Sequence, residues 1–128
     1  MSPRYRTALV TGASSGLGRA LAKQLSSQGT RVVLCSRRKS VLDEVAAELN
    51  GPSPIVCAFD LHDTDQAVAK IREADDRIGG LELIIANAGI AITHPPADQR
   101  WEDLSSMLRL NFEAAAATLL AVLPEMKK

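Results

Sequence analysis

The sequence predicts an α/β fold in which helices cover both faces of a parallel sheet. Four short apolar or β-branched runs alternate with four longer segments of helical periodicity along the 128 residues. Such alternation is typical of parallel strands that are joined by crossover helices. Glycines and prolines stand at the boundaries of the runs, where the chain has to turn.

The first half of the pattern is a strand, a helix and a second strand. The run "TALVT" at 7–11 predicts the first strand, and 17–28 predicts a helix whose leucines recur every four residues on one face. Those leucines are Leu17, Leu21 and Leu25. Gly29 then ends the helix as a left-handed cap. The run "RVVLC" at 31–35 does not alternate with polar residues, which indicates a strand buried on both faces.

The same unit follows twice more. Ser40 is expected to cap a helix over 41–49, which Asn50-Gly51 ends. The other expected elements are a strand at 54–59, a helix from Asp63 or Thr64 to about Ile78 closed by Gly79-Gly80, and a strand at 81–86. A loop with Pro95-Pro96 leads to a helix from near Asp98 to about Leu123, ahead of Pro124.

Right-handed crossovers between these elements favour a Rossmann-like, doubly wound parallel sheet with strand order 3-2-1-4 in one domain over 1–128. An apolar stripe on the last helix is expected to pack into the core. Its members are Trp101, Leu104, Leu108, Phe112 and Ala115.

Composition excludes several kinds of partner. The chain is 46% hydrophobic and 23% charged, and fifteen basic residues balance fifteen acidic ones, so no bulk field favours nucleic acid or an anionic membrane. The run 114–123 is too short to span a bilayer, and no signal peptide is expected at the start. Cys35 and Cys57 lack CxxC spacing and are interpreted as buried core thiols rather than a metal or redox site. A cytoplasmic setting is expected.

Three glycines lie between the first strand and the first helix. Gly12, Gly16 and Gly18 would let the backbone turn tightly and let a pyrophosphate approach the positive end of the helix. Ser14 and Ser15 add hydroxyl donors there. A tight turn without a ligand is the alternative, but the strand-bend-helix context favours a dinucleotide phosphate.

The end of the second strand indicates which dinucleotide is bound. An NAD site usually has an acidic residue there, whereas this chain has Ser36-Arg37-Arg38-Lys39 and no acid before Asp43. A guanidinium bonded to a 2′-phosphate is worth roughly 1.5–3 kcal/mol, so NADP(H) is predicted over NAD(H). Arg37 is the first candidate for this contact and Arg38 for stacking on the adenine; a solvated basic turn is the alternative.

The motif Thr11-Gly12-Ala13-Ser14-Ser15-Gly16-Leu17-Gly18 resembles the cofactor motif of the short-chain dehydrogenase/reductase family. Asp60-Leu61 is similar to the acidic pair with which that family contacts the adenine ring, although Asp60 could instead cap the third helix. Asn87-Ala88-Gly89 resembles the family's Asn-Asn-Ala-Gly, with Ala86 in place of the first asparagine. Asn87 is also expected to tie the fourth strand to its neighbours.

The resemblance implies an NADP(H)-dependent oxidoreductase that interconverts a carbonyl and an alcohol. It also implies a catalytic role for Asn111, which would hold a water of the proton relay from a buried helix position between Leu108 and Phe112. His94, and still more His62, are interpreted as non-catalytic.

The family's catalytic tyrosine, with a lysine four residues later, has no counterpart in the sequence. The single tyrosine is Tyr5, and Leu9 stands four residues after it. The chain therefore resembles the first half of such an enzyme, and by itself it is expected to be nearly inactive. The alternatives are a catalytically silent dinucleotide-binding or regulatory protein and an assembly module. An open edge at the fourth strand and an apolar last helix predict that the chain self-associates.

Overall fold

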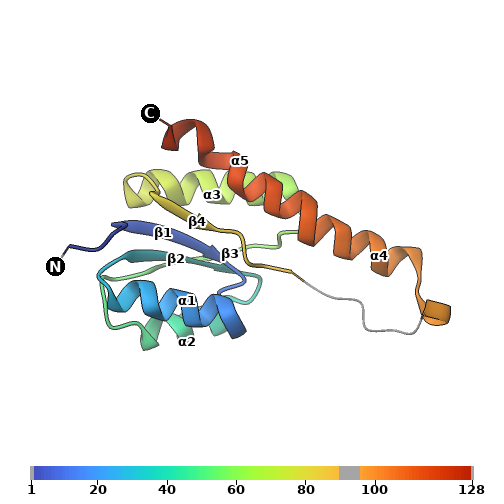
Figure 1. Cartoon of the computed structure of the whole chain (residues 1–128), viewed down its shortest axis with the longest axis horizontal. Helices are drawn as coiled ribbons and strands as arrows, with labels where there is room; N and C mark the ends of the chain where they lie inside the picture. Colours follow the sequence, from blue (N-terminus) through green and yellow to red (C-terminus); the bar gives the residue numbers. More distant parts are fainter. Residues whose placement is uncertain (1, 90–95, 128) are drawn as a thin grey trace.

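A computed structural model of the chain describes residues 2–89 and 96–127. Its centre is one parallel four-stranded sheet with the order β3-β2-β1-β4, which confirms the predicted topology (Figure 1). The strands are β1 (Thr7–Thr11), β2 (Arg31–Ser36), β3 (Ile55–Ala58) and β4 (Leu83–Ile85). β3 and β4 are shorter than predicted because their outer residues pair with no neighbouring strand.

Helices cover both faces of the sheet. The helices α1 (Gly16–Ser27) and α2 (Lys39–Glu48) lie on one face, and α3 (Thr64–Ile78) lies on the other (Figure 1). Successive strand residues point to opposite faces, so Leu9 packs towards α3 while Val10 packs towards α1 and α2. Both faces are therefore buried, as the continuous apolar strand runs predict.

The leucine face of α1 is only partly buried. Leu25 packs against the core, whereas Leu17 is 67% exposed. The buried residues of α1 are Gly18, Ala22 and Ser26, which are small and let the helix approach the sheet closely. The predicted cap of the second helix is wrong. Helix α2 begins at Lys39, so Ser40 lies inside its first turn and Arg38 stands at the cap position without a side-chain bond. Helix α3 follows its prediction, since the Asp63 side chain accepts a hydrogen bond from the backbone N–H of Gln66 at 3.0 Å.

The last helix begins and ends about three residues later than predicted. After a 3-10 turn at Pro96–Asp98, one helix runs through α4 (Trp101–Leu108), the π-helical segment η2 (Arg109–Ala114) and α5 (Ala115–Met126). Pro124 lies inside α5 instead of ending it, because only the last turn follows it and a single backbone hydrogen bond is lost.

This helix turns a different face inward from the one predicted. Leu110, Ala114 and Val122 are buried against α3 and the sheet. Trp101 and Phe112 of the predicted core stripe are instead 68% and 73% exposed, and Leu104 and Leu108 are exposed as well. The helix is apolar on two faces, and the sequence pattern does not indicate which of them packs inward.

The joined helix Trp101–Met126 has 26 residues and contains an 18-residue window with a mean hydropathy of 1.3, which by length and composition alone is enough to cross a membrane. The prediction that no segment is long enough considered only 114–123, which is part of this helix. Core helices of soluble proteins pass the same test, and one side of this helix packs against α3.

Candidate functional site

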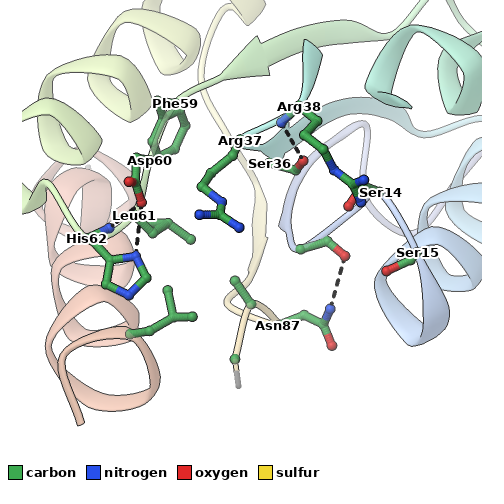
Figure 2. A pocket seen from close by; sticks show the side chains of 14 residues that line it. Ser14, Ser15, Ser36, Arg37, Arg38, Phe59, Asp60, Leu61, His62 and Asn87 are labelled. Atoms are coloured by element: carbon green, nitrogen blue, oxygen red, sulfur yellow. Dashed lines mark hydrogen bonds and ion pairs between the residues drawn. The ribbon is translucent and has the colours of Figure 1, made fainter. Parts of the chain in front are cut away.

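A pocket of about 290 Å³ opens at the carboxyl ends of the parallel strands, where open α/β sheets place their ligands (Figure 2). It is built from the loops that follow β1, β2, β3 and β4, together with one residue of η2. The lining residues are Gly12, Ser14, Ser15, Ser36, Arg37, Arg38, Phe59, Asp60, Leu61, His62, Asn87, Ala88, Gly89 and Leu110.

The glycine loop after β1 is shaped by close backbone contacts. Gly12 has φ +65°, and a Cβ built on it would lie 2.9 Å from the Cα of Ala88. A Cβ on Gly18 would lie 2.2 Å from the carbonyl oxygen of Gly12, so no other residue fits without moving the loop. Gly16 has φ +55° and no neighbour within 4 Å of such a Cβ, so it supplies the turn rather than a close approach.

The segment after β4 is held against this loop by hydrogen bonds. The Oγ1 of Thr11 accepts the backbone N–H groups of Asn87 at 3.0 Å and Ala88 at 3.1 Å. The Nδ2 of Asn87 donates to the carbonyl oxygen of Gly12 at 3.4 Å. Asn87 thus joins the ends of β1 and β4, as expected. The buried Thr11 was not singled out from the sequence, although a hydroxyl at a strand end beside a glycine turn is a usable signal.

The amino end of α1 faces the pocket with its positive dipole uncompensated. Its first turn contains no acidic residue, and Ser15 at the cap position makes no side-chain capping bond. Ser14 and Ser15 both line the pocket. This arrangement stabilises an anion at the loop.

Two arginines enter the pocket from the end of β2. Figure 2 shows Arg37 pointing into the middle of the pocket and Arg38 lying towards Ser14. Within the part of the chain that the structure describes, neither guanidinium forms an ion pair. The nearest acid along the sequence, Asp43, is engaged by Lys39 at 3.0 Å on α2. The β2 end therefore presents positive charge to the pocket, and no ion pair within the described residues engages it.

The opposite wall contains Asp60 and an unexpected histidine. The Oδ1 of Asp60 accepts the backbone N–H of His62 at 2.9 Å and lies 3.0 Å from the ring Nδ1 of His62. The ring Nε2 lies 3.0 Å from the Oγ of Ser106 on α4. The backbone N–H of His62 lowers the pKa of Asp60, and the His62 ring and Arg37 act in the same direction against the effect of burial.

The carboxylate of Asp60 is therefore fixed, ionised and linked to helix α4. His62 lines the pocket, although from the sequence it has less weight as a site residue than His94. A lone histidine two residues after a strand-end aspartate is the signal that could have found it. The partner Ser106 is 44 residues further along the chain and gives no local signal.

Other residues selected from the sequence lie outside the pocket lining. Gly16, Leu17 and Gly18 belong to the loop and the first turn of α1. Asn111 lies in η2 and is exposed, not buried between Leu108 and Phe112 as predicted. It does lie beside the pocket, since a Cβ built on Gly89 would come within 3.0 Å of its Oδ1. His94 falls outside the described residues.

The fold and the crevice define this molecule as a Rossmann-like α/β protein with a glycine loop at the first strand-helix junction. The family model described as short chain dehydrogenase matches residues 6–128. The chain therefore belongs to the short-chain dehydrogenase family.

Individual relatives agree. An uncharacterized oxidoreductase from Myxococcus xanthus is 43% identical over 124 residues, which is 95% of this chain and 49% of the relative. A short-chain dehydrogenase from Streptomyces avermitilis superposes with a TM-score of 0.88 at 28% identity, covering 99% of this chain and 46% of that one. A metagenomic short-chain oxidoreductase in complex with NADP gives 0.88 at 30% identity, with 94% and 56% covered. The chain thus spans about half the length of these relatives.

Proposed function

We propose that this chain binds NADP(H) and is the cofactor-binding half of an oxidoreductase that interconverts a carbonyl and an alcohol. The observation that carries the proposal is that one pocket combines a glycine loop at a helix amino end with two arginines that form no ion pair within the described residues. The solved relative in complex with NADP supports the same cofactor class.

The residues present fit such a dinucleotide. Gly12 and Gly18 let the loop pack closely against Ala88 and the start of α1, and Gly16 leaves open space beside it. The amino end of α1 with Ser14 and Ser15 would hold the pyrophosphate. Arg37 and Arg38 would hold the 2′-phosphate. Asp60 and Leu61 would contact the adenine. Asn87, Ala88 and Gly89 would line the part of the pocket through which the dinucleotide extends towards its nicotinamide.

When bound, the nicotinamide supplies hydride transfer. Asn111 would position a water near Gly89 for the accompanying proton transfer. The tyrosine-lysine pair that would donate that proton is absent from these 128 residues, whose one tyrosine is Tyr5. This chain by itself is therefore expected to bind the cofactor without turning over substrate. The second candidate is a catalytically silent dinucleotide-binding or regulatory protein.

Calorimetric titration of the 128-residue chain with NADP+ and then NAD+ tests the proposal. We expect saturable one-site binding of NADP+, at least about tenfold tighter than that of NAD+, because one charge-assisted bond is worth that factor. If the folded protein binds neither dinucleotide, the cofactor assignment is wrong and the assembly module is the remaining hypothesis. If the protein as it occurs naturally binds NADP+ tightly but turns over no carbonyl or alcohol substrate, the catalytically silent protein is favoured.

We propose further that the chain is cytoplasmic and self-associates through its last helix. Trp101, Leu104, Leu108 and Phe112 are exposed on α4 and η2, and β4 is an edge strand of the described sheet. Replacing Phe112 with serine is expected to shift the sedimenting species towards monomer. Leu17→Ser is the matched control, because Leu17 is equally exposed but lies on α1. A monomeric wild-type chain at high concentration would contradict this expectation.

A further inference from the structure

The two cysteines lie side by side, and the prediction of buried core thiols is confirmed for Cys35 but only in part for Cys57. Cys35 of β2 and Cys57 of β3 are partners in the parallel register, and both contribute to the apolar cluster on the α3 face. Cys35 is fully buried, whereas Cys57 is only partly buried. The 21 residues between them in the sequence conceal this pairing, because register is set by the sheet.

Cys57 opens into a cavity of its own, separate from the dinucleotide pocket. This cavity measures about 100 Å³ and lies between β3, an edge strand of the sheet, and α3. Two cationic side chains, Lys70 and Arg77, and one anionic side chain, Glu73, line it with Cys57. The local charge is therefore positive beside a thiol that small reagents can reach.

The pKa values of the two thiols are shifted in opposite directions. Hydrogen bonding to Cys57, and to a smaller extent burial, raises the pKa of Cys35, which keeps that thiol protonated. The hydrogen bond from Cys35 lowers the pKa of Cys57, and Lys70 and Arg77 act in the same direction against burial and Glu73. The Sγ of Cys57 lies 3.8 Å from the carbonyl oxygen of Lys70, a long and weak contact that favours the protonated thiol only slightly.

We propose that Cys57 is a site of reversible covalent modification by low-molecular-weight disulfides that carry a carboxylate, with Cys35 as its neighbour across the sheet. The Cys57 thiolate attacks one sulfur of the reagent disulfide, whose S–S bond breaks as the new bond to Cys57 forms. The other half of the reagent leaves as a thiolate with the electron pair. A free thiol reverses the exchange. Lys70 and Arg77 attract the carboxylate, and the cavity admits the reacting sulfur.

Reaction of the full chain with 5,5′-dithiobis(2-nitrobenzoate), followed by release of the nitrobenzoate thiolate, tests this site. We expect one fast equivalent per chain, located on Cys57 by peptide mass. In Cys57→Ser the remaining reaction should be about a hundredfold slower or more, because buried Cys35 reacts only through local opening. A single fast equivalent on Cys35, or no fast equivalent, would overturn the proposal.

Neutral iodoacetamide separates thiolate formation from attraction of the reagent. The pH at which its reaction with Cys57 is half-maximal should lie below that of free glutathione measured alongside, and Cys35→Ala should raise it. Lys70→Gln should slow the anionic disulfide about two- to fivefold, and iodoacetamide less, as expected for one partly exposed charge. Circular dichroism checks that each variant folds. If the half-maximal pH for Cys57 lies at or above that of glutathione, Cys57 does not have a lowered pKa. If it is unchanged in folded Cys35→Ala, Cys35 does not lower the pKa of Cys57. Either result would overturn the proposal.

Discussion

Replacing Arg37 with glutamate is expected to raise the Kd for NADP+ about ten- to a hundredfold and to change the Kd for NAD+ little, because the lost charge-assisted bond is worth roughly 1.5–3 kcal/mol. The two dinucleotides differ only in the 2′-phosphate. Arg37 points into the middle of the pocket, and no ion pair within the described residues holds its guanidinium elsewhere (Figure 2). Isothermal titration calorimetry with each dinucleotide measures the change.

Lys39→Glu is the matched control for this experiment. It makes the same change of charge two residues further along the chain, but Lys39 lies on α2, bonds Asp43 at 3.0 Å and does not line the pocket. It should leave both Kd values nearly unchanged. If Lys39→Glu weakens NADP+ binding as much as Arg37→Glu does, the preference arises from the general field of the basic turn. In that case the contact assigned to Arg37 is wrong.

The sheet could be predicted from the sequence because local and tertiary signals agree in it. The runs at β1 and β2 are apolar without alternation, as strands buried on both faces must be, and the crossover rule leaves few strand orders. The last helix could not be predicted in the same way. Its inward face depends on the shape of α3 and on the π-helical turn at Arg109–Ala114, which shifts the phase of the apolar pattern.

The pocket was predictable where its residues follow strand ends in sequence. Gly12, Arg37, Asp60 and Asn87 all come directly or nearly directly after a strand, and parallel topology brings those ends together. The bond between His62 and Ser106 was not predictable, because it depends on where α4 lies over the loop after β3. Such contacts between distant segments leave no spacing that a sequence pattern can show.

Replacing Gly18 with alanine is expected to lower the free energy of unfolding by about 1–3 kcal/mol, the usual cost of overpacking, and to weaken NADP+ binding as well. The new Cβ would lie 2.2 Å from the Gly12 carbonyl oxygen and 2.6 Å from the Nδ2 of Asn87. The Gly12 carbonyl belongs to the backbone directly after β1, so it cannot move without moving the glycine loop. Urea denaturation measures the stability, and titration of the folded protein measures the binding.

Two further variants separate close approach from the general cost of losing a glycine. Gly16→Ala meets no atom within 4 Å and costs only the strain of φ +55°, about 1–2 kcal/mol, so it should be the milder change. Adding Asn87→Ala to Gly18→Ala removes the amide contact but leaves the carbonyl contact, so the double variant should recover only in part. Full recovery, or a Gly18→Ala variant no less stable than Gly16→Ala, would mean that the helix is not seated on the Gly12 carbonyl. The positive end of α1 would then not be held at the position that we propose for the diphosphate.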